Sequence, residues 1–454
     1  MSHSHSSHEK ANSTQDFATG SIPSVVIKNA LPAMIAMIMV MVYNLADTFF
    51  ISLTHDDYMI AAVSLGAPVF MIFMSLGTLF GVGGTSVISR ALGSGDSDRA
   101  KKACSFCTWS SIGIGVILMA VLWIFADKFC VILGASENTM EYTSTYLKIV
   151  VGCGVFSMVS NCHSNIVRAE GEAMKAMTGQ LIGNLLNVIL DPIFILALDW
   201  GIAGAAVATV IGNVVAALYY FAHFLGKKTQ LSIRLRDFSM KDGILKGVVS
   251  IGISASLANL LVSVTSMITN SLMAGYGDLF VAAYGVTAKV LLIVTMLGIG
   301  IGAGVQPVLG YCYGAKNRSR LNGFIRFAVF FATIVCLTVS VLCFIFARPV
   351  VGIFLTDAGA LESGIKFTRI MLVTAWTVGA FVVCQNTLQA MGKATPALLA
   401  SIFRQAILYI PIVFILRAIM GMEGLLWAQP VADVISLVII VIMLLSSLKK
   451  SELD

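Results

Sequence analysis

The sequence contains little charge, little proline and little cysteine. Asp, Glu, Lys and Arg together make up 11% of the 454 residues, whereas a soluble domain has about 25%. Such a chain cannot cover a water-facing surface of its size. With 9 Pro, 9 Cys and 40 Gly, it also lacks the composition of a disordered segment, a disulfide scaffold or collagen. Hydrophobic residues reach 58% and the mean hydropathy is +0.91, so we expect an all-α polytopic membrane protein.

Motifs for catalysis and for ATP hydrolysis are missing as well. The six His residues form no catalytic motif, and the phosphate-binding pattern G-x-x-x-x-G-K-[ST] does not occur. Cys104 and Cys107 form a lone C-x-x-C pair, with no second pair to complete a metal site. The polar start MSHSHSSHEK indicates a solvated tail rather than a cleaved signal peptide. We therefore predict neither an enzyme nor a protein with a bound cofactor.

Twelve apolar stretches are long enough to cross a membrane, which takes about 20 residues of helix. Because the number is even, both termini should lie on the same side. The stretches are residues 24–53, 59–89, 103–126, 142–168, 173–198, 201–226, 243–274, 280–311, 322–346, 361–391, 395–420 and 423–447.

The positive charges orient the chain. Of the 29 Lys and Arg residues, 21 fall in the tails and in one set of alternate loops, and six fall in the opposite set. Lys289 and Arg404 fall inside predicted helices. Cytoplasmic loops carry the excess of Lys and Arg, so we expect both termini in the cytoplasm. The same distribution excludes nucleic-acid binding as the meaning of the net charge of +6.

The two halves of the chain repeat each other, as corresponding residues align after a shift of 221 positions. We predict two homologous six-helix bundles, residues 21–226 and 243–447, with a cytoplasmic linker at 227–242 and cytoplasmic tails at 1–20 and 448–454. Such repeats are typical of transporters, with the substrate path between the halves. The aligned pairs include Gly77 with Gly298, Gly81 with Gly302, Gly83 with Gly304, Gly93 with Gly314, Arg99 with Arg320 and Asn165 with Asn386.

Only three acids lie well inside predicted helices: Asp47, Asp191 and Asp433. A charged residue at a helix centre costs about 2.5–3.5 kcal/mol on the insertion scale, so such residues face protein or water and mark an ion or substrate site. For Asp47 the alternative is a position near the helix end, below the polar residues that start at His55.

Two of these acids belong to a predicted cation site. Asp47, Asp191 and Thr209 each lie eight residues from an outer loop, at a common depth of roughly 12 Å. On the fifth helix Asn184, Asn187 and Asp191 are spaced three and four apart and share a face. Carboxylate, amide and hydroxyl oxygens suit a hard cation such as Na⁺, and two neighbouring carboxylates can instead hold a proton. The alternative is hydrogen bonding between helices by the Asn and Thr residues.

Pro32 lies fifteen residues before Asp47 in the first helix. It removes a backbone hydrogen bond, so we expect a kink there. The kink either moves when Asp47 changes its proton or ion, or is a fixed bend.

Several further stretches form a recognisable pattern: Val42–Ile51, Gly83–Gly93, Arg168–Gly171, Asn184–Phe194 and Gly201–Thr209. In these stretches, and over residues 24–447 as a whole, the sequence resembles the multidrug and toxic compound extrusion (MATE) family of cation-coupled exporters. The resemblance implies a V-shaped arrangement of the two bundles that exports amphipathic, mostly cationic compounds in exchange for Na⁺ or H⁺. It also implies that the cation site of the N-terminal half falls on Asp47, Asn187, Asp191 and Thr209. We expect the protein to act as a monomer in the cell membrane.

One departure from the family pattern concerns the C-terminal half. Some members carry acids in the seventh and tenth helices, but residues 250–273 and 370–391 contain no Asp or Glu here. We therefore expect ion coupling in the N-terminal half. Asp433 either attracts cationic cargo or pairs with Arg404 or Lys289. A flippase for lipids or lipid-linked oligosaccharides is the alternative function, but it favours a strongly basic cavity, whereas the inner charges here are mainly acidic.

Overall fold

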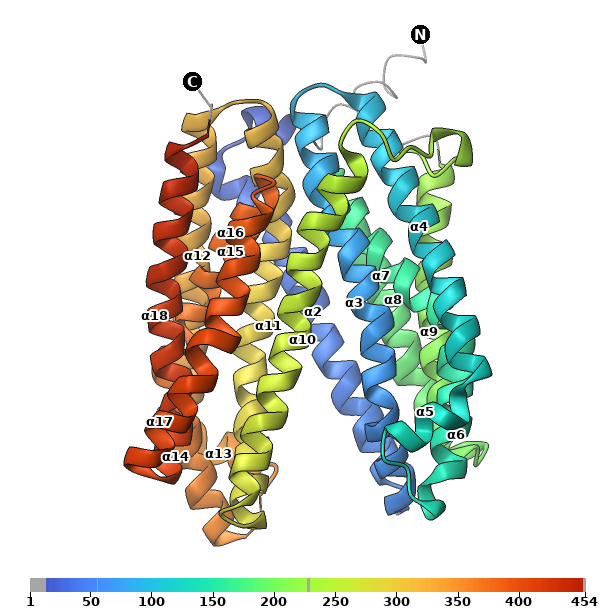
Figure 1. Cartoon of the computed structure of the whole chain (residues 1–454), viewed down its shortest axis with the longest axis vertical. Coiled ribbons are helices and arrows are strands. Elements are labelled where there is room, and N and C mark those ends of the chain that lie inside the picture. The colour runs from blue at the N-terminus through green and yellow to red at the C-terminus, as the bar shows by residue number, and fades with distance from the viewer. Residues whose placement is uncertain (1–13, 55, 227–228, 356, 452–454) are drawn as a thin grey trace. The chain divides into compact units, whose positions relative to one another are not determined.

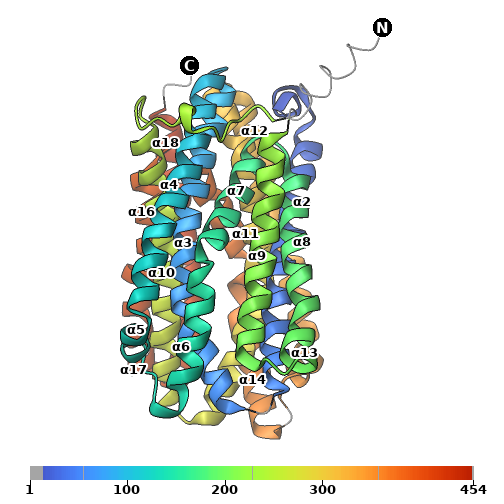
Figure 2. The same cartoon turned by 90° about the vertical axis from the view of Figure 1, so that its right-hand side faces the viewer.

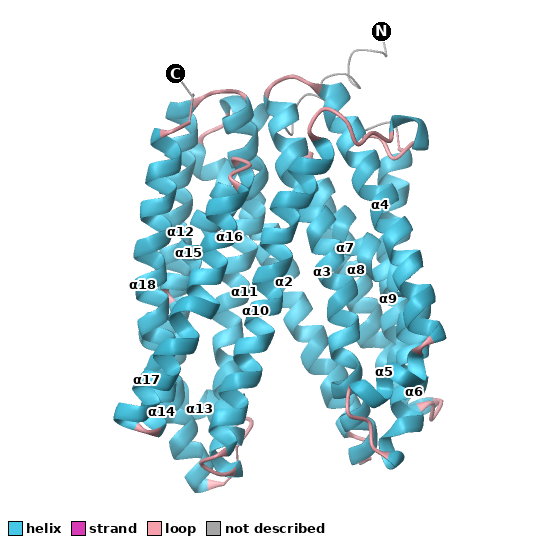
Figure 3. Ribbon diagram, in the orientation of Figure 1, coloured by secondary structure: helices cyan, strands magenta, loops and turns pink. Residues whose placement is uncertain are grey.

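The computed structural model describes residues 14–54, 56–226, 229–355 and 357–451, so the His-rich start of the chain and His55 lie outside it. All regular secondary structure in this part is helical (Figure 1, Figure 3). Ten helices of the described part are long and apolar enough to cross a membrane, and two bent helix pairs, each taken as one span, bring the number to twelve. The predicted class of a twelve-span helical membrane protein is confirmed.

Polar residues set the starts of the membrane helices in the first half. Asp56 caps α3 by accepting the backbone N–H groups of Tyr58 and Met59, and Asp96 caps α4 by accepting the Arg99 backbone N–H. The elements of this half and the linker are α2 (Ile22–Ser52), α3 (Asp57–Gly93), α4 (Ser97–Ile124), α5 (Ala126–Ile132), α6 (Glu137–Gly152), α7 (Gly154–Ala169), α8 (Ala173–Pro192), η1 (Ile193–Ala197), α9 (Gly201–Leu225) and η2 (Leu235–Asp237).

The second half repeats this arrangement. Asn317 caps α12 by accepting from the Arg320 N–H, just as Asp96 accepts from the Arg99 N–H, and the 221-residue shift relates these positions. The elements are α10 (Ile244–Ala274), α11 (Asp278–Gly314), α12 (Arg318–Ile345), α13 (Ala347–Gly352), α14 (Ala358–Ala375), α15 (Thr377–Ala390), α16 (Ala394–Ile402), η3 (Phe403–Tyr409), α17 (Ile410–Met420) and α18 (Met422–Lys449).

The fourth and tenth spans are broken helices. The axis turns by 49° between α6 and α7, and by 42° between α14 and α15. The sequence predicts neither break, since no proline marks them. In the fourth span, a Cβ on Gly154 would lie 2.5 Å from the Phe73 ring, so glycine permits this close approach. The two π-helical segments η1 and η3 were likewise not predicted, and such segments are frequent at functional sites.

The described chain divides into two compact units. Unit 1 holds the described residues up to Thr19 together with Ile38–Gly252, and unit 2 holds Gly20–Met37 together with the described residues from Ile253 onward. The first helix of each half, α2 or α10, therefore belongs partly to one unit and partly to the other. The division by contacts thus differs from the division by sequence at residues 227–242.

Glycines allow this exchange of helix ends. In unit 1 a Cβ on Gly83 of α3 would lie 2.1 Å from the Val248 carbonyl oxygen of α10. In unit 2 a Cβ on Gly304 of α11 would lie 2.5 Å from the Asn29 carbonyl oxygen of α2. Gly83 and Gly304 correspond in the repeat, so the same close backbone contact occurs once in each unit.

Candidate cation-binding site

The helices α8 and α9 pack side by side in unit 1 with their backbones in close contact (Figure 2). A Cβ on Gly183 would lie 2.8 Å from the Gly212 carbonyl oxygen, and a Cβ on Gly212 would lie 2.5 Å from the Gly183 carbonyl oxygen. No side chain fits at either position without separating the helices. The contact brings Asn187, one turn after Gly183, next to Thr209, one turn before Gly212.

Asn187 joins two other predicted site residues. Its Nδ2 atom lies 3.2 Å from Oδ1 of Asp191 and 3.3 Å from Oγ1 of Thr209, and it donates to both oxygens. Asn187 is 3% exposed and Asp191 is fully buried. The fifth and sixth spans thus bring three of the predicted oxygen donors together.

Asp47 lies next to this group, on the part of α2 that belongs to unit 1. Its carboxylate is close enough to Asp191 for the two negative charges to repel each other. One turn further along α2, Ile51 packs against Ile195 of η1 and Ala205 of α9 in a buried apolar cluster. This cluster fixes the end of α2 against the helices that carry the other site residues.

Three oxygen atoms of the group lack a hydrogen-bond donor. Oδ1 of Asp47, Oδ1 of Asn187 and Oδ2 of Asp191 are buried and accept no hydrogen bond from the described residues. A buried acceptor left in this state costs about 1–3 kcal/mol. A hard cation bound by oxygen, or a proton held between carboxylates, removes this cost. The donor set does not suit a transition metal, since no three His, Cys, Asp or Glu side chains cluster in the described chain.

Two further residues predicted for this half are not hydrogen-bonded to the group. Asn184 makes no side-chain hydrogen bond to it, and its Nδ2 atom is buried without a partner among the described residues. Pro32 lies inside the continuous helix α2, but in the segment that belongs to unit 2.

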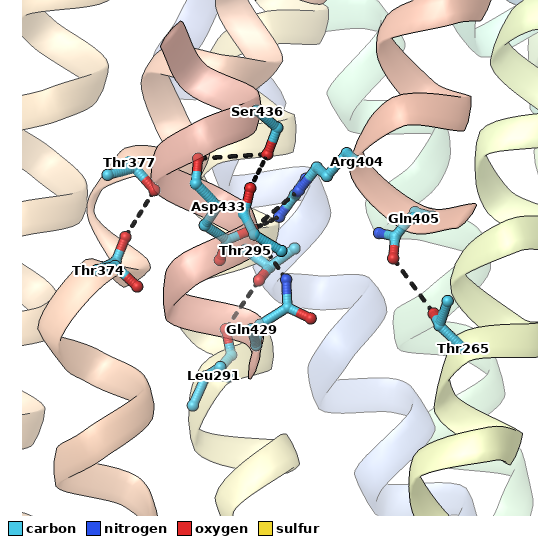
Figure 4. Close-up of polar contacts among 11 residues, drawn as sticks. Thr265, Leu291, Thr295, Thr374, Thr377, Arg404, Gln405, Gln429, Asp433 and Ser436 are labelled. Carbon is cyan, nitrogen blue, oxygen red and sulfur yellow. Dashed lines mark hydrogen bonds and ion pairs between the residues drawn. The ribbon is translucent and has the colours of Figure 1, made fainter. Parts of the chain in front are cut away.

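The third intramembrane acid, Asp433, forms an ion pair in unit 2 (Figure 4). The Arg404 guanidinium donates to Oδ1 of Asp433 from Nε at 3.0 Å, with a second nitrogen also at 3.0 Å, and Gln429 donates to the same oxygen at 2.8 Å. The Arg404 guanidinium also lies 4.7 Å from the centre of the Phe381 ring. Of the two partners considered from the sequence, Arg404 is the one in contact, whereas Lys289 lies over the Phe354 ring.

Several residues near these acids were missed from the sequence. The Tyr43 and Tyr146 side chains lie close enough to Asp47 and Asp191 to interact electrostatically with the two carboxylates. Tyr43 comes one turn before Asp47, so helical spacing alone could have identified it, and Gln429 stands in the same relation to Asp433. Tyr146 lies on α6, and nothing in the sequence points to it.

A cavity of about 500 Å³ lies at the end of unit 1, lined by α3, α6, η1, α9 and the loops that connect them. Its wall includes Leu53, six residues after Asp47, and Ile195, four residues after Asp191. Three carboxylates line it, those of Asp56, Glu141 and Asp199. The cavity is thus acidic and lies near the same helix segments as the buried site.

Comparison with known proteins adds four findings. The family model described as MatE matches residues 32–193 and 255–415. The chain is 32% identical over 404 residues to multidrug export protein MepA of Staphylococcus aureus (strain MSSA476), which covers 89% of each chain. It is 26% identical to a multidrug resistance MATE family transporter of the MOP superfamily solved in an outward-facing conformation, with a TM-score of 0.92, covering 97% of this chain and 99% of that one. A MATE structure in a bent conformation has a TM-score of 0.87 at 26% identity, covering 97% and 98%.

Proposed function

Because the chain belongs to the multidrug and toxic compound extrusion (MATE) family, whose members are multi-pass membrane transporters and not enzymes, we propose that it is a secondary active multidrug exporter. It exchanges amphipathic, mostly cationic organic compounds for Na⁺ or H⁺ by alternating access. Its relative MepA is a multidrug export protein, which supports this class of cargo. It works as a monomer in the plasma or inner membrane, with both termini in the cytoplasm, as the Lys and Arg distribution favours.

The observation that carries this proposal is the set of unpaired oxygens in unit 1. Asp47, Asn187 and Asp191 each leave a buried oxygen without a donor, and Thr209 adds a hydroxyl at the same place. These groups bind the coupling cation, either Na⁺ or a proton. Asn184 lies about two turns from Asp191, and its side chain contacts the cation as the cation approaches or leaves the site.

Cation entry and cargo export are coupled because the cation and the cargo bind different conformations of the protein more tightly. A cation between Asp47 and Asp191 relieves their repulsion and stabilises one conformation, whereas bound cargo stabilises the other. Each net charge that crosses the membrane adds about 2.3 kcal/mol per 100 mV. The acidic cavity formed by Asp56, Glu141 and Asp199 concentrates cations on the outer side.

Pro32 and Asp433 have supporting roles. Pro32 leaves α2 without one backbone hydrogen bond, so the helix bends there as the cation site empties and fills. A related MATE structure described as bent is consistent with such a change. Asp433 contacts cationic cargo through Oδ2, because Arg404 and Gln429 both donate to Oδ1 of this carboxylate.

Transport by purified protein in liposomes tests the proposal. The vesicles contain a cationic dye, and Na⁺ and H⁺ gradients are imposed separately. One of them should drive dye movement, and Asp47→Asn and Asp191→Asn should abolish it. Asp98→Asn is the matched control, since Asp98 is an exposed acid on α4. Dye that follows neither gradient would remove cationic cargo from the proposal, and wild-type transport by Asp47→Asn would remove the cation site.

A further inference from the structure

Four polar residues form a row along α8. Gln180, Asn184, Asn187 and Asp191 are spaced four, three and four apart, so they lie on one face of the helix. Each carries one buried atom without a hydrogen-bond partner among the described residues: Oε1 of Gln180, Nδ2 of Asn184, Oδ1 of Asn187 and Oδ2 of Asp191. No other described helix carries more than two such atoms. The row begins at the cation site and continues about 16 Å toward the Ala173 end of α8.

The row lies on the side of α8 opposite to its exposed apolar face. The opposite face of α8 carries the exposed apolar side chains of Ile182, Leu185 and Ile189. Gly179 and Gly183, which border the row, contact α9 at Tyr220 and Gly212. The unpaired polar atoms therefore lie on the protein side of the helix.

A structural role in holding helices together does not account for the row. Such a role requires hydrogen bonds to neighbouring helices, yet the Gln180 and Asn184 side chains make none with the described residues. A buried polar group without a partner is destabilising, and water satisfies such groups when several line one space. The row supplies hydrogen-bond acceptors at Gln180, Asn187 and Asp191 and a hydrogen-bond donor at Asn184. A chain of water molecules can hydrogen-bond to all four groups.

We propose that Gln180 and Asn184 line a hydrated path by which the coupling cation passes between the Asp47–Asp191 site and the cytoplasmic end of α8. This inference rests on the proposed function, because it needs a cation to be carried. The side-chain oxygens and amides replace part of the hydration shell while the cation crosses the apolar half of unit 1. Gln180 and Asn184 determine the rate of cation passage, whereas Asp47, Asn187 and Asp191 determine its affinity.

The test measures the rate of transport and the affinity for the coupling cation separately. Gln180→Met and Asn184→Leu remove the polar atoms at nearly constant size, whereas Gln180→Ser and Asn184→Ser keep polarity and leave room for water. Thr178→Val is the matched control, since Thr178 lies on α8 and bonds only to its own helix, at the Met174 carbonyl. Cation-driven dye transport in liposomes gives the turnover, and calorimetry with Na⁺, or proton uptake if H⁺ is coupled, gives the affinity.

We expect both apolar variants to turn over about 10- to 100-fold more slowly with an unchanged cation affinity, and the serine and Thr178→Val variants to behave like wild type. Wild-type turnover in the apolar variants overturns the path. Parallel loss of affinity and turnover in an apolar variant whose thermal unfolding is normal also overturns it, by placing that residue in the binding site. If the wild-type protein neither binds nor exchanges the cation, the proposed function fails, and the path fails with it.

Discussion

The Arg404 guanidinium and the Asp433 carboxylate lie 3.0 Å apart, and their side chains are only 15% and 6% exposed. A buried pair of this kind leaves unit 2 without a net charge at that point, although each residue alone is costly in a membrane. Gln429 and the Phe381 ring add further contacts to the two groups. Removing one partner of the ion pair should therefore lower the stability of the protein much more than removing both.

We predict that Arg404→Leu lowers stability by about 3–5 kcal/mol, because it leaves the Asp433 carboxylate buried and unpaired. The double variant Arg404→Leu, Asp433→Leu should recover most of the loss. Thermal unfolding in detergent measures both. If Arg404→Leu unfolds like wild type, the pair does not hold unit 2 together.

The glycine contact between α8 and α9 gives a second prediction. Gly212→Ala places a Cβ against the Gly183 carbonyl oxygen and separates the helices, which should cost about 1–3 kcal/mol. Cation affinity should also fall, because Asn187 and Thr209 move apart. Gly113→Ala on α4 is the control, since no atom lies within 4 Å of its Cβ position. Equal effects of the two variants on unfolding and on affinity would argue against a specific contact.

Thr209 provides a test of a single oxygen donor. Thr209→Val keeps the shape of the side chain but removes the hydroxyl that lies 3.3 Å from Asn187. We expect about tenfold weaker cation binding, in line with the loss of one hydrogen-bonding partner in a buried site. Thr209→Ser should retain most of the affinity. Calorimetric titration with the coupling cation measures this, and tight binding by Thr209→Val would exclude the hydroxyl as a ligand.

For Pro32 we expect stability and transport to change in opposite directions. Pro32→Ala restores a backbone hydrogen bond inside α2, so the protein should be as stable as wild type or more so. Dye transport should nevertheless fall by about tenfold, because a conformation with a bent α2 becomes less accessible. Pro68→Ala, inside α3, is the control. Normal transport by Pro32→Ala would mean that the proline only sets a fixed bend.

The linker between the halves is attached to unit 1 through Glu170. This buried carboxylate accepts the Thr229 hydroxyl at 2.8 Å and the Gln230 backbone N–H. Glu170→Ala should release the linker and increase tryptic cleavage at the exposed Arg234 and Arg236 by about tenfold. Limited proteolysis followed by mass spectrometry measures the rate.

The control for the linker experiment is Glu172→Ala. Glu172 instead pairs with Lys175 on the same helix end, 3.2 Å away. Its removal should leave the cleavage rate unchanged. Equal rates in the two variants would show that Glu170 does not secure the linker.

Much of the fold is contained in local properties of the sequence. The length and spacing of the apolar stretches predicted all twelve spans, because each span must satisfy its own backbone within a helix. The repeat was visible because both halves need glycine where backbones meet, as at Gly83 and Gly304. On α8 the three-and-four spacing predicted that Asn187 and Asp191 share a face, since helical periodicity is fixed within one element.

Tertiary packing decided the rest. Whether Asp433 meets Arg404 or Lys289 depends on how α16 and η3 pack against α18, and spacing along the chain holds no information on this. The bends near Cys153 and Trp376 have no proline to mark them. Asn184 and Asn187 share one face of α8, but only Asn187 bonds to α9, because the Gly183–Gly212 crossing brings Thr209 to Asn187. The sequence alone determined which residues face inward on each helix, whereas the approach of one helix to another determined which of them meet, since that approach depends on side chains from distant parts of the chain.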